Sequence, residues 1–80
     1  MAKQDILAKV ISLVVEQLNV EVSMVASDSR FVENLGADSL DLFEMTAKLE
    51  EYYGIKIPDE EAETLGSVGD VVEYLVPRIR

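Results

Sequence analysis

The chain of 80 residues contains no cysteine, no histidine and no tryptophan. Without cysteine it can form no disulfide, thiol nucleophile, iron–sulfur cluster or thiolate zinc site. Without histidine it lacks the imidazole base of a Ser–His–Asp triad and the commonest protein ligand of zinc and copper. No EF-hand calcium motif is present either. We therefore expect no catalysis by a thiol or an imidazole and no bound metal.

Long hydrophobic runs are also missing. No apolar run exceeds three residues, and Asp5, Lys9, Ser12 and Glu16 interrupt the first segment. We expect neither a signal peptide nor a membrane span, and we take the cytoplasm as the default location.

Positive charge is scarce. Sixteen Asp and Glu stand against seven Lys and Arg, which gives a net charge of −9. Nucleic acids and anionic membranes repel such a chain, so we expect basic partners and no nucleic acid. The charge is uneven, because residues 38–63 contain nine acids and two lysines, a net −7. A charge run is usually only a solvated face, and that interpretation stays open here.

The amino-acid composition is typical of a globular protein, with 49% hydrophobic and 29% charged residues. Eighty residues allow one domain, residues 1–80, and we expect a monomer. Apolar residues at spacings of three and four predict a helix over residues 3–18. A second helix is expected over residues 39–53, with Asp38 as N-cap, Asp41 completing a capping box, and Gly54 at the end.

The rest of the chain predicts shorter elements. Residues 20–38 lose the period and form a long loop, whose apolar residues we expect to pack on the core: Val22, Val25, Phe31, Val32 and Leu35. A short acidic turn is expected over residues 60–65, and Ser67 and Asp70 begin a last helix that Pro77 ends. The predicted fold is all-α: a four-helix bundle with a short third helix and a long loop between the first two.

Spacing separates two faces of the second helix. The residues expected to be buried are Leu42, Met45, Thr46, Leu49 and Tyr53. The residues on the other face are Leu40, Asp41, Phe43, Glu44, Ala47, Lys48 and Glu51. A face that is apolar at its centre and charged at its rim is typical of a docking surface. The alternative, that Phe43 packs against the long loop, has equal support from spacing.

Ser39 begins this helix. A phosphoryl group on its hydroxyl would meet free backbone N–H groups and the positive end of the helix dipole. Asp38 and Asp41 oppose a free phosphate, so the position suits a phosphate held covalently or neutralised by a partner. Taken alone, however, a serine at a helix start is usually a cap.

The residues around Ser39 carry a family resemblance: Leu35-Gly36-Ala37-Asp38-Ser39-Leu40-Asp41. This segment resembles the attachment motif of the acyl carrier proteins of bacterial fatty acid synthesis. The resemblance extends over the chain, through residues 31–34, 49–51 and 57–63. It implies that a phosphopantetheinyl transferase, using coenzyme A and magnesium, attaches 4′-phosphopantetheine to Ser39. The thiol of that arm carries acyl chains as thioesters, so the resemblance implies a carrier and not an enzyme.

The same resemblance implies two further sets of residues. Enzymes with basic docking surfaces are expected to contact Asp38, Leu40, Asp41, Phe43, Glu44, Glu50 and Glu51. An acyl chain is expected to be sheltered by Phe31, Leu42, Ile57, Ala62 and Leu65. These five residues also suit an ordinary core, since the pocket of a bundle is lined by its core.

Several alternatives stay open. Lys48, Phe43 and Ala47 depart from the common pattern of the family and indicate a specialised partner. The cargo could be a polyketide, a peptidyl group or D-alanine on the same arm. From a different class, the chain could be an unmodified acidic interaction protein. A hydrolase using Ser39 is disfavoured, because the chain has neither a histidine nor a G-x-S-x-G context.

Overall fold

The structure is a computed structural model that describes residues 2–79. Within this range the chain forms four α-helices, one short 3₁₀ helix and no strand. The elements in chain order are α1 (Lys3–Leu18), η1 (Val22–Met24), α2 (Ser39–Tyr53), α3 (Asp59–Ala62) and α4 (Val68–Leu75). The predicted helical bundle, with its short third helix and its long loop between the first two, is therefore confirmed.

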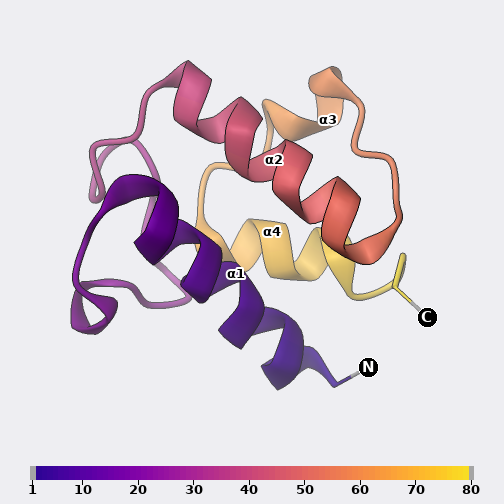
Figure 1. Cartoon of the computed structure of the whole chain (residues 1–80), viewed down its shortest axis with the longest axis horizontal. Helices are drawn as coiled ribbons and strands as arrows, with labels where there is room; N and C mark the ends of the chain where they lie inside the picture. Colours follow the sequence, from indigo (N-terminus) through magenta and orange to yellow (C-terminus); the bar gives the residue numbers. More distant parts are fainter. Residues whose placement is uncertain (1, 80) are drawn as a thin grey trace.

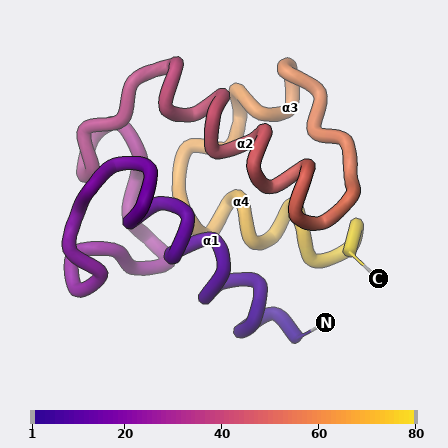
Figure 2. The backbone as a smooth tube through the Cα atoms, viewed as in Figure 1, coloured from indigo at the N-terminus to yellow at the C-terminus, as the bar shows by residue number. Residues whose placement is uncertain are grey.

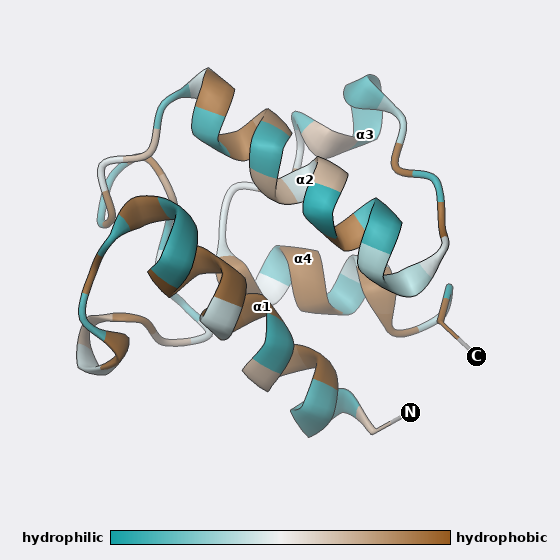
Figure 3. Ribbon diagram, in the orientation of Figure 1, coloured by the Kyte–Doolittle hydropathy of each residue, from teal (hydrophilic) through white to brown (hydrophobic). Residues whose placement is uncertain are grey.

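The helix α1 organises the bundle, because it packs against both α2 and α4, while α3 packs against α2. In Figures 1 and 2, α4 is seen between α1 and α2, α3 lies beyond α2, and both chain ends are on the same side. Colouring by hydropathy shows apolar and polar residues interleaved along α2 (Figure 3). The largest fully buried side chains come from α1 and α4: Ile6, Leu75, Val10, Val14 and Val68.

Local caps fix the ends of α2. The Asp38 carboxylate accepts a hydrogen bond from the Asp41 N–H at 2.9 Å. In return the Asp41 carboxylate accepts one from the Asp38 N–H at 3.2 Å, which completes the predicted capping box. At the other end Gly54 adopts a left-handed conformation with φ of 67°. The observed bounds of α2 confirm the prediction. They could be predicted because both caps depend on residues that are close in the sequence.

The long loop packs on the core only in part. Val25 and Phe31 are buried and Leu35 is half-buried, as expected. The prediction is wrong for Val22 and Val32, whose side chains are 63% and 54% exposed. The loop lacks a helical or strand period, so its sequence does not show which apolar side chains turn inward.

Backbone hydrogen bonds hold the loop against the start of α4. The Phe31 N–H donates to the Gly66 carbonyl at 3.1 Å, and the Gly69 N–H donates to the Ser27 carbonyl at 2.7 Å. A Cβ atom on Gly69 would lie 2.8 Å from that Ser27 oxygen, so the close approach requires a glycine. These bonds tie the middle of the loop to the segment that begins α4.

Candidate functional site

Ser39 lies where the long loop becomes a helix. It is the first residue of α2, it follows the N-cap Asp38, and it is exposed to solvent. The sequence predicted this position. The hydroxyl is therefore accessible to a modifying enzyme, and the first turn of α2 places the positive end of the helix dipole beside it.

An open groove of about 320 Å³ begins at Ser39. Its walls come from two helices and the residue that follows α3: Ser39, Leu42, Phe43, Ala62 and Glu63. Phe43 is 45% exposed. In this groove Phe43 lies opposite Ala62 and Glu63 and is open to solvent. The alternative that Phe43 packs against the long loop is therefore wrong. Glu63 was not among the expected site residues, because nothing in the sequence fixes how the short α3 turns toward α2.

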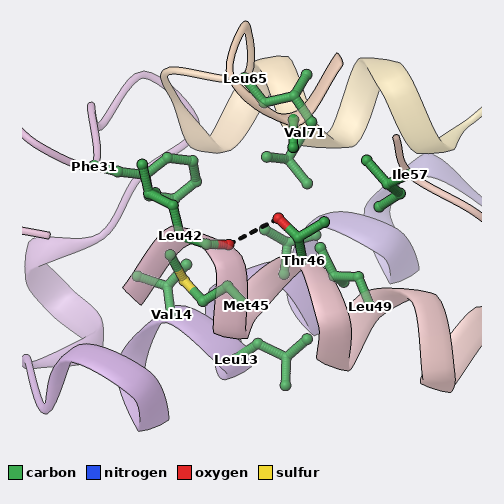
Figure 4. Close-up of a pocket in the computed structure, with 12 residues that line it drawn as sticks. Leu13, Val14, Phe31, Leu42, Met45, Thr46, Leu49, Ile57, Leu65 and Val71 are labelled. Carbon is green, nitrogen blue, oxygen red and sulfur yellow. Dashed lines mark hydrogen bonds between the residues drawn. The ribbon is translucent and has the colours of Figure 1, made fainter. Parts of the chain in front are cut away.

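A second, inner cavity lies in the core (Figure 4). All five residues expected to shelter an acyl chain line it: Phe31, Leu42, Ile57, Ala62 and Leu65. The remaining lining residues are Val10, Leu13, Val14, Met45, Thr46, Leu49 and Val71. Its volume is about 20 Å³, which is room for about one water molecule. Leu42 and Ala62 line both the groove and the cavity, so these two side chains lie between the two spaces.

One polar side chain, Thr46, interrupts the apolar lining of the inner cavity in the described part of the chain. Its hydroxyl donates to the Leu42 carbonyl at 2.8 Å, the bond drawn in Figure 4. Threonine side chains inside helices commonly form this hydrogen bond with the backbone carbonyl four residues earlier. The sequence placed Thr46 on the buried face, but helical spacing did not show that it borders a cavity.

The outward face of α2 has the predicted mixed character. Asp38, Glu44 and Glu51 are exposed, and Asp41 is half-buried. Leu40 is 65% exposed, which makes it a large apolar side chain without internal contacts over most of its surface. The structure therefore brings the expected acidic and apolar residues together on one surface, with Phe43 at its border with the groove.

Glu50 is placed differently from the rest of that set. It is half-buried, and its carboxylate accepts a hydrogen bond from the Ile57 N–H at 2.8 Å. This contact fastens the segment that links α2 to α3. A contact between a helix and the chain seven residues later depends on the path of the link, which residue spacing does not reveal.

The other edge of the α2 face is joined to α1 by Gln17. The Gln17 amide donates to the Glu44 carboxylate at 2.6 Å, and the Lys48 ammonium donates to the Gln17 oxygen at 2.9 Å. Lys48 is thus held at the α1 side of the surface. No pattern in the sequence predicts these bonds, since they join residues of two different helices.

Few ion pairs neutralise the acidic side chains. Among residues 2–79 the ion pairs are Arg30 with Glu33 and Arg78 with Glu61, the latter at 3.6 Å. Neither involves the acids of α2. The negative charge of the outward face is therefore available to a cationic partner.

These features suit a covalently attached phosphate arm. The serine hydroxyl is exposed, it stands at the positive end of a helix of 15 residues, and it lines a groove that shares Leu42 and Ala62 with an apolar cavity. The neighbouring Asp38 and Asp41 carboxylates make the same place unfavourable for a free phosphate ion.

Comparison with known proteins identifies the family. The model of a family described as phosphopantetheine attachment site matches residues 8–75. The chain belongs to this family. The acyl carrier protein of Wolinella succinogenes is 59% identical over 63 residues, covering 79% of this chain and 83% of that protein. The acyl carrier proteins of Prochlorococcus marinus and Akkermansia muciniphila are 52% and 51% identical over 75 residues, 94% of this chain and 94% of each relative.

Membership of the acyl carrier protein family gives the chain its cofactor, 4′-phosphopantetheine, and its general role. Acyl carrier proteins are carriers and not catalysts, and the attached arm supplies the thiol on which an acyl group is held as a thioester. A protein without cysteine can serve thioester chemistry in this way. No helix in residues 2–79 has the length and apolar character needed to cross a membrane.

Proposed function

We propose that the protein carries acyl chains as thioesters on a 4′-phosphopantetheine arm attached to the Ser39 hydroxyl. It delivers them to enzymes of fatty acid synthesis or of a related acyl-processing pathway. The observation that carries this proposal is the position of Ser39, exposed at the start of α2 and at the mouth of the groove. The proposal also places the protein in the cytoplasm, where coenzyme A is available to supply the arm.

Each part of the site has a role in this proposal. Ser39 supplies the oxygen to which the phosphoryl group is joined, and it needs no base of its own because the phosphopantetheinyl transferase activates the hydroxyl. The capping box of Asp38 and Asp41 fixes the first turn of α2, so the serine is presented on a rigid element. The positive helix end favours the phosphate once it is attached.

The inner cavity is the proposed shelter for the acyl chain. Leu42 and Ala62 line both the groove and the cavity and are the proposed point of entry, and the cavity walls are mainly apolar. A volume of about 20 Å³ is far too small for an acyl chain, so the cavity must widen on loading. The four-residue helix α3 packs only lightly, against α2, and its displacement from α2 is the proposed opening movement.

The outward face of α2 is the proposed docking surface for partner enzymes. Its residues are Asp38, Leu40, Asp41, Phe43, Glu44 and Glu51, while Glu50 is left out because its carboxylate is bonded to the backbone of the link between α2 and α3. An exposed ion pair contributes only about 0–1 kcal/mol. A cluster of acids therefore acts mainly by accelerating and orienting the encounter with basic partners, which suits a carrier that must dissociate again.

The proposal is tested by enzymatic loading. The protein is incubated with coenzyme A, magnesium and a broad-specificity phosphopantetheinyl transferase, and the intact mass is measured. We expect the mass to rise by one 4′-phosphopantetheine group. With octanoyl-coenzyme A we expect an octanoyl arm whose acyl group is removed by neutral hydroxylamine, as a thioester requires. A mass that stays unchanged would contradict the proposal and favour an unmodified acidic interaction protein.

A further inference from the structure

The inner cavity contains a polar feature that a shelter for a purely saturated chain would not need. Thr46 is half-buried, and among residues 2–79 it is the one polar residue in the apolar lining of the cavity. Its hydroxyl oxygen lies 2.8 Å from the Leu42 carbonyl oxygen. A carbonyl can only accept a hydrogen bond, so the threonine proton points to Leu42 and away from the cavity.

This arrangement determines what Thr46 offers to a chain in the cavity. With its proton engaged, the hydroxyl oxygen keeps lone pairs that can only accept. A saturated chain leaves that acceptor unpaired, and a keto group would bring a second acceptor against it. A hydroxyl group on the chain can donate to it. Burying a polar group without a partner is unfavourable, so the difference between these three cargoes is largest in this apolar setting.

The position of Thr46 along α2 places it on the route of the cargo. It lies seven residues after Ser39, or about 10 Å along the helix and on nearly the same side. Leu42, the residue to which it is bonded, lines both the groove and the cavity. Because the bond is made within α2, it moves with that helix and persists when the cavity widens.

From this geometry we propose that Thr46 makes the cavity selective for acyl chains that carry a hydroxyl group, over saturated and keto chains of the same length. The inference rests on the proposed function, since it requires that an acyl chain enters the cavity at all. The inference goes beyond the proposed function by naming the class of cargo that the cavity lining favours.

The test compares loaded proteins by their melting temperatures. Wild type, Thr46→Val and Thr46→Ser are each loaded on Ser39 with octanoyl, hydroxyoctanoyl and oxooctanoyl arms, with the hydroxyl or keto group at the third, fifth or seventh carbon, and loading is confirmed by intact mass. Each melting temperature is referred to the unacylated arm-bearing form of the same variant. Valine has nearly the shape of threonine without its hydroxyl, and serine keeps the hydroxyl, so the pair separates hydrogen bonding from packing.

We expect at least one hydroxyoctanoyl isomer to raise the melting temperature of the wild type by about 3–8 °C more than octanoyl does, as one added hydrogen bond would in a domain of this size. Oxooctanoyl should give the smallest increase. The hydroxyl preference should vanish in Thr46→Val and remain in Thr46→Ser.

The outcomes separate the two proposals. If octanoyl raises the melting temperature but no hydroxyoctanoyl isomer adds to it, or if Thr46→Val keeps the preference, the inference about Thr46 is wrong while the carrier function stands. If no acyl arm changes the melting temperature, the sheltered cavity is wrong as well. If no arm can be attached, the proposed function itself fails.

Discussion

At the scale of single residues, Tyr53 is an unusual member of the core. Its side chain is half-buried, and within residues 2–79 its hydroxyl oxygen is buried without a hydrogen-bond partner. Its ring meets the ring of Tyr52 edge to face, with centroids 4.8 Å apart. Burial raises the pKa of the Tyr53 hydroxyl, and the nearby Tyr52 and Asp5 raise it further when they are negatively charged.

These features predict the behaviour of Tyr53→Phe. The substitution keeps the ring and removes an unpaired hydroxyl, so we expect the melting temperature at pH 7 to stay the same or to rise by up to about 5 °C. Because the folded-state pKa of Tyr53 is raised, the stability of the protein does not depend on this ionisation below the unfolded pKa of about 10, and it falls as the pH rises from there through the folded value.

Thermal melts from pH 8 to about pH 11 measure this effect. The wild type should lose stability at the alkaline end more steeply than Tyr53→Phe, which has no ionisable group at this position. Identical slopes for the wild type and Tyr53→Phe would contradict the assignment of the loss to Tyr53.

Single residues also show how far the site could be predicted from the sequence. Ser39 and its capping partners were placed correctly, since capping depends on residues within one turn of each other. The inward contact of Glu50 and the bonds of Gln17 were not predicted. Their partners are seven or more residues away, and only the packed fold brings them together.

At the scale of elements, α2 combines the serine, one wall of the groove and the proposed docking surface. The charges on its outward face predict opposite effects for two substitutions. Glu44→Lys should slow transfer to an enzyme with a basic docking surface, by about three- to tenfold at low salt, because it replaces attraction by repulsion. Lys48→Glu should accelerate the same transfer, since it removes a positive charge from the edge of the face.

The measurement is kcat/KM of a partner acyltransferase with each arm-bearing variant, at low and at moderate ionic strength. Glu73→Lys on α4 is the matched control, because it is exposed and changes the net charge by the same amount as Glu44→Lys. Salt should shrink the differences. If Glu44→Lys and Glu73→Lys slow transfer equally, net charge alone is responsible and α2 is not the docking surface.

The elements differ in how well the sequence predicted them. The bounds of α1 and α2 are confirmed, since helical periodicity identifies both segments and the caps of α2 fix its two ends. The third helix begins and ends earlier than the predicted turn over residues 60–65, at Asp59–Ala62. Four residues are too few for a period, so the position of α3 depends on its packing against α2.

At the scale of the whole molecule, the excess of negative charge is the main feature. The chain has a net charge of −9, and the part of it that the structure describes has two ion pairs. Like charges gathered on a small surface destabilise the compact state, and dissolved ions screen them. Raising NaCl from about 20 mM to about 200 mM should therefore raise the melting temperature by about 2–5 °C.

A charge-reduced variant gives the comparison for this prediction. Glu51→Gln with Glu60→Gln removes two exposed carboxylates from the acidic region of residues 38–63. It should melt at a higher temperature than the wild type at low salt and should respond less to added salt. If the wild type melts at the same temperature throughout the salt range, charge repulsion has no significant part in its stability.

The overall fold and the family could be predicted because helical periodicity, capping and the segment around Ser39 each depend on residues that are close together in the sequence. The cavity could be predicted only as a set of residues, and the groove, with Glu63 in its wall, was not predicted. The size and shape of both depend on how α3 and the long loop pack, which involves the whole molecule.

The central claim is that one serine out of six carries the arm. The most direct measurement is fragment mass spectrometry of the protein after loading by the transferase, together with the intact masses of Ser39→Ala and Ser67→Ala. Ser67 is the matched control because it also stands at a helix start, where its hydroxyl accepts from the Asp70 N–H at 3.2 Å. We predict one arm, located on Ser39, with full loading of Ser67→Ala and none of Ser39→Ala. An arm on another serine, or a loaded Ser39→Ala, would contradict the claim.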